Sequence, residues 1–247
     1  MEARIGVDVG GSGIKVGSVD VVTGELIGHR LRVDTPEPST PDAVAYAIKG
    51  LVDEFDTGGP IGIGIPVVVR NGWVSTASNV DQSWIGVNAF DVMEPVIRRE
   101  IKLINDADAA AVAEVRYGAA KGVPGKVLVL TFGTGIGSGL LIDGRLVPNI
   151  EVGQLELAGV RPAERRYSAK VRRAEGLTWE EWGARAREFV VLANEVFNPD
   201  LIVIGGGISK FWDEFSSYLT FGDVRTAPAS FRNKAGIVGA AALAFSD

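Results

Sequence analysis

The chain has 247 residues, of which 46% are hydrophobic and 23% charged, as expected for a globular protein with a large core. Acidic residues outnumber basic ones by 31 to 25, so we expect binding neither to nucleic acids nor to anionic membranes. The lack of cysteine excludes disulfides and thiolate-bound zinc. The sequence also has no signal-peptide pattern and no apolar run near 20 residues, so we expect a cytoplasmic protein.

The N-terminal part of the chain is predicted to form strands joined by tight turns. Arg4–Val9 is an apolar strand that ends at Gly10, Gly11 and Gly13, and a second strand, Ile14–Asp20, follows these glycines. A third strand, Glu25–Val33, follows the Thr23–Gly24 turn.

A helix is predicted after the proline-rich loop that follows these strands. It covers Asp42–Phe55 with Pro41 in its first turn, a position that favours proline. Its inward residues are expected to be Ala43, Ala47, Leu51 and Phe55. Ile61–Ile65 is then a short buried strand, and residues 67–76 form a hairpin around Asn71–Gly72.

The remaining elements alternate between helices and strands. In chain order they are a helix near Ala89–Glu100, a strand Ile101–Asn105, a helix Asp108–Tyr117, a strand Lys126–Thr131, a glycine-rich turn Phe132–Gly139, a hairpin of Leu140–Asp143 with Arg145–Val147, a helix Thr178–Phe197, a strand Leu201–Ile204 and a helix Gly236–Phe245.

One supersecondary unit occurs twice in this order. A strand, a glycine-rich turn and a second strand appear at residues 4–20 and again at 126–143. Two similar α/β halves, each with a glycine-rich turn at a strand end, predict two lobes with a cleft between them. We expect residues 1–105 with about 236–247 to form a small N-terminal lobe, and residues 106–235 a large C-terminal lobe.

The first glycine-rich turn, in DVGGSGIK, has the composition of a phosphate-binding loop. Its glycines let a phosphate approach backbone N–H groups without a Cβ in the way. Asp8 is suited to a water-mediated Mg²⁺ ion. The predicted donor-binding residues here are Asp8, Gly10, Gly11, Ser12 and Lys15. A plain hairpin turn is the alternative for this motif taken alone.

The second glycine-rich turn, in LTFGTGIGSGL, repeats this composition. An apolar strand and a hairpin follow it instead of a helix, which argues against a dinucleotide-binding fold. A third turn at residues 205–207 precedes Lys210. The predicted donor-binding residues in these turns are Thr131, Gly133, Thr134, Gly135, Gly206 and Lys210.

Asp106 is the candidate catalytic base. It follows the strand in KLIND, at the end where a side chain can accept the proton of a bound alcohol. The alternative is that Asp106 or Asp108 caps the following helix.

The segment NIEVGQLE carries carboxylates and amides that can bind the hydroxyls of a sugar. Trp84, in SNVDQSW, lines a pocket or packs in the core, and the core is favoured.

A basic run, RPAERRYSAKVRR, extends from Arg161 to Arg173. A line of cations beside the donor site would attract a chain of phosphates. The alternative is an exposed, solvated helix face. Weaker candidates for the same role are Lys121, Lys126, Lys210 and Lys234.

These motifs together resemble a known family. DVGGSGIK, GIGIP, INDADAA, LTFGTGIGSG and IGGGIS, in this order, are similar to the ROK family of sugar kinases and repressors. SNVDQSWIG, LTWEEW and FNPDLIVIGGGISK resemble its polyphosphate glucokinase and glucomannokinase branch, and the similarity extends from about residue 4 to 245.

The resemblance implies an α/β, actin-like (ribonuclease H-like) fold of two lobes with a central cleft, and a homodimer. It implies phosphoryl transfer from polyphosphate, ATP or both to the 6-hydroxyl of glucose, with Mg²⁺ and without zinc. By the same resemblance Asp106 is the base, and the sugar-binding positions are Asn79, Asn105, Glu151, Gln154 and Glu156.

Two positions depart from the family pattern. Gln154 stands where the family has a histidine, and Val67 stands where it has a glycine. These changes leave open another hexose, an amino sugar or a cyclic polyol as the acceptor. A sugar-responsive repressor would need a DNA-binding segment before the first strand, for which we expect no room. A non-catalytic sugar-binding relative is disfavoured by the intact Asp106.

Overall fold

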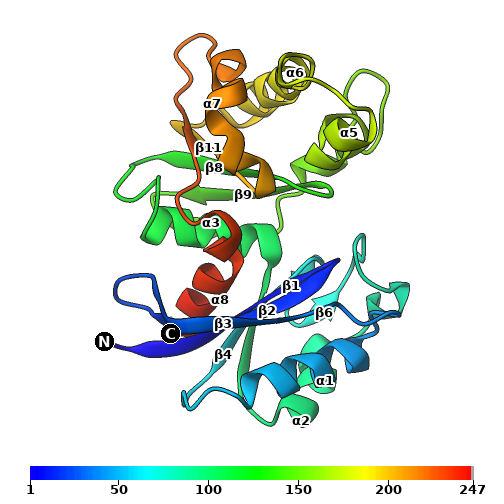
Figure 1. Cartoon of the computed structure of the whole chain (residues 1–247), viewed down its shortest axis with the longest axis vertical. Coiled ribbons are helices and arrows are strands. Elements are labelled where there is room, and N and C mark those ends of the chain that lie inside the picture. The colour runs from blue at the N-terminus through cyan, green and yellow to red at the C-terminus, as the bar shows by residue number, and fades with distance from the viewer. Residues whose placement is uncertain (246–247) are drawn as a thin grey trace. The chain divides into compact units, whose positions relative to one another are not determined.

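The structure is a computed structural model that describes residues 1–245, and it divides into two compact units. Unit 1 consists of Met1–Ala113 and the C-terminal segment from Lys234, and unit 2 is Glu114–Asn233 (Figure 1). The chain passes from unit 1 to unit 2 within the helix that contains Ala113 and Glu114, and it returns to unit 1 at Lys234, just before the last helix. The lobe boundaries predicted from the sequence stay a prediction.

Unit 1 is built on a five-stranded sheet with the order β3-β2-β1-β4-β7. β1, β2 and β3 form an antiparallel meander, whereas β4 and β7 run parallel to β1. The strands are β1 Ala3–Gly10, β2 Gly13–Asp20, β3 Glu25–Val33, β4 Ile61–Ile65 and β7 Ile101–Asn105. β4 is buried along its whole length, as expected for a central parallel strand covered on both faces.

Unit 2 repeats this topology in a second five-stranded sheet with the order β10-β9-β8-β11-β12. Its antiparallel meander is followed by two strands parallel to β8. The strands are β8 Lys126–Phe132, β9 Ile136–Ile142, β10 Arg145–Val147, β11 Leu201–Gly205 and β12 Thr226–Pro228. The internal repeat predicted from the glycine-rich turns is confirmed, and the paired sheets have the topology of the actin-like fold.

Helices cover both faces of the sheet of unit 1 (Figure 1). α1 (Pro41–Val52) and α2 (Ala89–Ile97) lie on one face, and α8 (Ala235–Phe245) lies on the other. α3 (Asp106–Arg116) begins directly after β7. α8 contacts the sheet closely, because a side chain at Gly6 or Gly62 would overlap its backbone. This explains two glycines in the middle of buried strands.

α1 is shorter than predicted, and its buried face extends beyond the predicted residues. It ends at Val52, and its buried face includes Val44, Ala45, Ile48 and Leu51. Of the residues expected to face inward, Leu51 is buried, Ala47 and Phe55 are partly buried against the core, and Ala43 is partly buried. Val44 and Ile48 were not predicted, and they bury more apolar surface than the alanines.

Unit 2 carries a core rich in aromatic side chains. α6 (Trp179–Phe197) starts with a capping box between Thr178 and Glu181 and buries Trp182 and Phe189 against Phe132 of β8. The other helices are α4 Glu164–Tyr167, α5 Ala169–Ala174 and α7 Trp212–Phe215. Short 3₁₀ turns occupy Gln82–Trp84 in unit 1 and Val152–Gln154, Gly207–Phe211, Ser216–Leu219 and Arg232–Lys234 elsewhere.

The predicted hairpin at residues 67–76 is present as β5 (Val69–Arg70) and β6 (Trp73–Val74). Asn71 and Gly72 both have positive φ, at 51° and 84°, as a type I′ turn requires.

Trp84 is 1% exposed and its indole N–H donates to the carbonyl of Ser39, which confirms that it belongs to the core. In residues 1–245 no helix combines the length and the apolar character needed to cross a bilayer.

Candidate functional site

The first glycine-rich turn joins β1 to β2 in unit 1. Gly10 pairs with Gly13 at the tip, and Asp8 pairs with Lys15 two residues back along each strand. The Lys15 Nζ lies 2.7 Å from the Asp8 Oδ2, and both side chains are largely shielded from solvent. The predicted phosphate loop therefore carries a preformed ion pair at its base.

The carboxyl ends of the parallel strands bring several predicted residues together in unit 1. Asp8 of β1 pairs with Gly64 of β4, and the Cα of Asp106 lies 3.6 Å from the position that a Cβ on Gly64 would occupy. A Cβ on Gly11 would lie 3.3 Å from the carbonyl oxygen of Asn79. The edge where open α/β sheets bind their ligands thus holds Asp8, Gly11, Asn79 and Asp106.

The start of α3 is capped by Asn105, a residue that the alternative of a cap by Asp106 or Asp108 did not name. Its Oδ1 accepts from the backbone N–H groups of Ala107 at 2.9 Å and Asp108 at 3.2 Å. Its Nδ2 donates to the carbonyl of Val67 at 3.2 Å. The Val67 side chain is 2% exposed within the core of unit 1, where its bulk is accommodated. Asp106 Oδ1 shares the N–H of Ala107, at 2.9 Å.

The second and third glycine-rich turns lie against each other in unit 2. Gly205 of β11 pairs with Thr131 of β8, and Gly206 has a φ of 79°. A Cβ on Gly206 would lie 2.5 Å from the carbonyl oxygen of Phe132, so only glycine fits there. The structure therefore joins the two turns that the sequence placed on the donor side. Lys210, in the following 3₁₀ turn, has its Nζ 4.7 Å from the centre of the Phe211 ring.

Glu164 is a residue of this region that the sequence reasoning missed. Its carboxylate accepts from the backbone N–H of Ile136 at 3.0 Å and from Gln154 Nε2 at 3.4 Å. Gly135 packs directly on it. Glu164 thus connects the second glycine-rich turn to Gln154. The one signal in the sequence was an acidic residue inside an otherwise basic run.

The segment carrying the remaining predicted sugar-binding residues is held by Ser138 of β9. The Ser138 hydroxyl donates to the carbonyl of Ile150 and accepts from the N–H of Val152 at 2.9 Å. Glu151, between them, is partly buried, and Glu156 is exposed. The predicted sugar ligands are therefore divided: Asn79, Asn105 and the base Asp106 belong to unit 1, and Glu151, Gln154 and Glu156 to unit 2.

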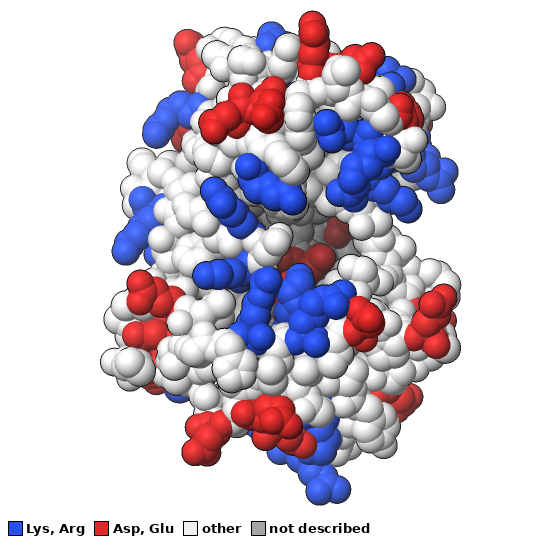
Figure 2. All heavy atoms as spheres, in the orientation of Figure 1, with Lys and Arg blue, Asp and Glu red and all other residues white. Residues whose placement is uncertain are grey.

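The basic run is not a single solvated helix face. It folds into the short helices α4 and α5, and the guanidinium of Arg172 stacks 3.5 Å from the centre of the Trp179 ring. Arg166 is also partly buried, and the exposed cations of the run are Arg161, Arg165, Lys170 and Arg173. Figure 2 shows basic side chains gathered over the region of α5. Lys126 instead donates to the carbonyl of Phe197, which removes it from the donor-side candidates.

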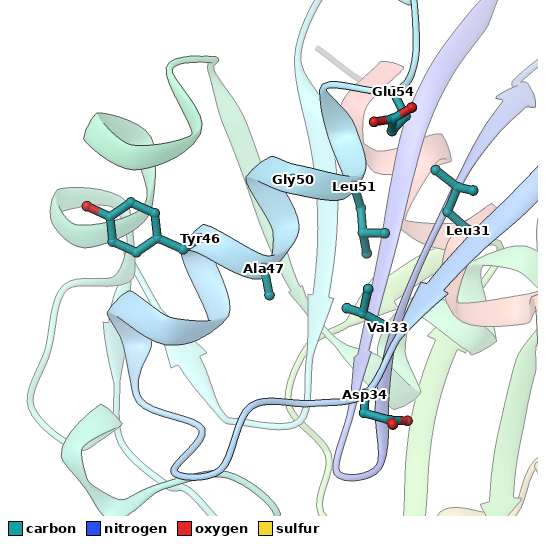
Figure 3. A pocket seen from close by; sticks show the side chains of 8 residues that line it. All are labelled: Leu31, Val33, Asp34, Tyr46, Ala47, Gly50, Leu51 and Glu54. Carbon is teal, nitrogen blue, oxygen red and sulfur yellow. The ribbon is translucent and has the colours of Figure 1, made fainter.

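A shallow groove of about 550 Å³ lies between β3 and α1 (Figure 3). None of the predicted site residues lines it. Its walls are mainly apolar, and its lining includes the two acidic residues Asp34 and Glu54. The groove is therefore separate from the predicted donor-binding residues.

The residues on the first turn fit a Mg²⁺ ion bound through water. Magnesium bound with a phosphorylated substrate usually keeps several waters and uses one or two carboxylates. Asp8 supplies one carboxylate beside the turn. Within residues 1–245 no group of three or more histidine, cysteine, aspartate or glutamate side chains is placed to hold a metal directly.

Comparisons with known proteins extend over nearly the whole chain. The ROK family profile matches residues 4–151. Polyphosphate glucokinase of Mycobacterium tuberculosis is 46% identical over 245 residues, which cover 98% of this chain and 91% of the relative. Polyphosphate glucokinase of Mycobacterium leprae is 43% identical over 243 residues, covering 98% of this chain and 74% of the relative.

Solved structures give the same result. The inorganic polyphosphate/ATP-glucomannokinase from Arthrobacter sp. strain KM is 44% identical, with a TM-score of 0.92 and coverage of 98% of this chain and 97% of that one. A ROK family glucokinase from Streptomyces griseus, solved with glucose and AMPPNP, is 25% identical with a TM-score of 0.81 and 98% coverage of both chains. With a family match over more than half its length and relatives 46% identical across it, the chain belongs to the ROK family.

Proposed function

We propose that this chain is a sugar kinase that transfers a phosphoryl group from polyphosphate, ATP or both to the 6-hydroxyl of glucose or a related hexose. The relatives at 46% and 43% identity are polyphosphate glucokinases. The Arthrobacter relative, 44% identical, is a polyphosphate/ATP-glucomannokinase. These likenesses span almost the whole chain, so they include both units.

The observation that carries the mechanism is the place of Asp106 on the carboxyl edge of the unit 1 sheet, beside Gly64 and the strand of Asp8. In the proposed step the sugar O6 attacks the terminal phosphorus of the donor and the bond to the bridging oxygen breaks. The Asp106 carboxylate takes the proton of the hydroxyl. Positioning and charge stabilisation supply most of the remaining rate enhancement.

The glycine-rich turns bind the donor in this proposal. In unit 1 the backbone N–H groups of the first turn and Lys15 would bind phosphate oxygens, and in unit 2 the second and third turns, with Thr131 and Lys210, would do so. A bound Mg²⁺ ion would supply further neutralisation of the donor's charge, with Asp8 holding it through water. The exposed cations of the basic run would attract a chain of phosphates towards unit 2.

The sugar is held by Asn79, Asn105, Glu151, Gln154 and Glu156 in this proposal. Asn105 keeps capacity for that role, because its amide has two N–H donors and only one is directed to Val67. We also infer that units 1 and 2 act as the two lobes predicted from the sequence, and that the protein works as a cytoplasmic homodimer with no nucleic-acid or membrane partner. Light scattering of the purified protein measures the oligomeric state.

A second candidate is the same reaction on another hexose or a polyol. Gln154 donates to Glu164, so the side chain that replaces the family histidine is already oriented by the protein. A neutral amide at this position differs from histidine in reach and in charge, and this favours testing acceptors other than glucose. An amino sugar is one class of acceptor to include in the test.

The proposed function is tested by a coupled assay that crosses several sugars with polyphosphate and ATP. The Asp106→Asn variant is compared with Asp42→Asn, which changes an exposed aspartate in the first turn of α1 of the same unit. We expect the Asp106 variant to lose about 10²–10⁴-fold in kcat while sugar binding survives, and the Asp42 variant to match wild type. Near-normal turnover of Asp106→Asn would remove the mechanism. No turnover of wild type with any pair would remove the function.

A further inference from the structure

Arg32, on β3, lies on the first glycine-rich turn, although no motif marks it. Its Nη2 donates to the carbonyl of Ser12 at 2.9 Å. A Cβ on Gly13 would lie 2.7 Å from its Nε and Nη2. The guanidinium therefore packs against the backbone of the loop that is proposed to bind phosphate.

The segment just after β3 contacts the turn at a second point. The Thr35 hydroxyl donates to the carbonyl of Gly10 at 2.5 Å. With Arg32 bound to Ser12, carbonyl groups on both sides of Gly11 are engaged by side chains. The turn is thus held in one shape before a ligand arrives, which lowers the entropy cost of binding.

Arg32 is also the direct cross-strand partner of Lys15. Two cations opposite each other on adjacent strands normally destabilise a sheet. Each has one carboxylate partner: Lys15 pairs with Asp8 at 2.7 Å, and Arg32 pairs with Asp34 at 2.9 Å. The Asp34 side chain is 86% exposed, so its pair with Arg32 contributes little. An anion with more than one charged oxygen would satisfy Lys15 and Arg32 together.

The Arg32 side chain is available for such an anion. It is 50% exposed, and its bonds to Ser12 and Asp34 use only part of a group with five N–H donors. A planar guanidinium binds phosphate oxygens two at a time, which an ammonium group cannot do.

We propose that Arg32 is a donor-binding residue that, with Lys15, binds the non-transferred phosphates of the phosphoryl donor at the first glycine-rich turn. The inference rests on the proposed kinase function and adds a ligand to its donor site. The chemistry recognised is a linear chain of phosphate oxyanions, which polyphosphate and the triphosphate of ATP share. Separate assays with the two donors distinguish these sources.

The test uses the full-length chain with Arg32→Gln, Arg32→Lys and the control Arg30→Gln, which removes the same charge from an exposed position on the same strand. We expect Arg32→Gln to raise the KM for one or both donors about tenfold over the control, with the KM for glucose unchanged. Arg32→Lys is expected to recover part of this loss. The donor KM of Arg32→Gln should also depend less on salt than that of the control.

Two further results separate a purely structural role from donor binding. Calorimetry with inorganic tripolyphosphate measures binding without turnover, and we expect about tenfold weaker binding for Arg32→Gln than for Arg30→Gln. If the donor KM and tripolyphosphate affinity of Arg32→Gln stay within twofold of the control, the inference is overturned while the kinase function stands. If wild type shows no kinase activity but binds tripolyphosphate through Arg32, the kinase function fails and the anion site remains.

Discussion

Gly236, the second residue of α8, lies so close to Asp8 that a Cβ at position 236 would be 2.7 Å from the Asp8 Cγ and Oδ1. α8 therefore begins directly against the carboxylate proposed to hold Mg²⁺. The free N–H groups at the start of a helix favour a negative charge, so α8 and Lys15 stabilise the same group from two sides. Only a glycine at position 236 lets α8 lie this close to the Asp8 side chain.

Gly236→Ala is predicted to reduce donor-dependent activity. The added methyl group displaces the Asp8 carboxylate, and a shift of about 1 Å in an active-site group can lower turnover by up to about a hundredfold. Steady-state kinetics with polyphosphate and ATP measure the effect. The control is Gly50→Ala in α1, where nothing lies within 4 Å of the new methyl group. We expect this control to keep wild-type kinetics and to gain about 0.5–1 kcal/mol of stability. Wild-type kcat/KM in Gly236→Ala would contradict the role given to this contact.

Asn105→Ala is predicted to destabilise unit 1 by about 1–3 kcal/mol. The substitution removes the cap of α3 and leaves the carbonyl of Val67 without its side-chain donor in a buried place. Urea unfolding measures the change. Asn105→Ser keeps a capping oxygen and is expected to lie between Ala and wild type. Equal stability of the Ser and Ala variants would show that the cap contributes nothing here.

Glu114→Gln is predicted to lower the free energy of unfolding by about 1–3 kcal/mol. The buried carboxylate accepts from the backbone N–H groups of Ala119, Ser230 and Phe231, at 3.0, 2.9 and 2.8 Å. An amide has one acceptor oxygen, so at least one of these N–H groups loses its partner. Thermal and urea unfolding measure the loss, with the exposed Glu195→Gln as control. A variant as stable as the control would refute this account.

Tyr167 is predicted to ionise at higher pH than an ordinary tyrosine. Burial raises its pKa, and so does the hydrogen bond that its hydroxyl donates to Glu188 at 2.9 Å. The neutral phenol is therefore favoured in the folded state. Its contribution to stability is complete below the unfolded pKa of about 10 and is lost as the pH rises through the folded pKa.

The absorbance change of phenolate formation measures this titration. Wild type has four tyrosines, and the difference from Tyr167→Phe isolates the contribution of Tyr167. We expect that contribution to appear above the ordinary tyrosine pKa of about 10, and we expect the stability of Tyr167→Phe to fall less than that of wild type as the pH rises through this range. A Tyr167 signal at the ordinary tyrosine pKa would contradict the prediction.

Much of the local structure could be predicted because short-range chemistry fixes it. β3, β4 and β7 have the predicted bounds, since apolar runs ended by turn residues define strands with little help from the rest of the chain. The I′ turn at Asn71–Gly72 follows from residues that tolerate positive φ. The buried face of α1 was predicted only in part, because several faces of this helix carry apolar residues and the choice among them depends on how the helix packs on the sheet.

The sequence by itself determined the two glycine-rich repeats, the strands around them, the family and the candidate base Asp106. Only the tertiary structure decided that Asn105 caps α3, that Glu164 joins Gln154 to the second turn, and that Arg32 and Gly236 reach the first turn and Asp8. The reason is physical. Glycine patterns and strand ends are properties of neighbouring residues, whereas these contacts join residues on different strands and helices, whose alignment is set by sheet register and by burial of the whole core.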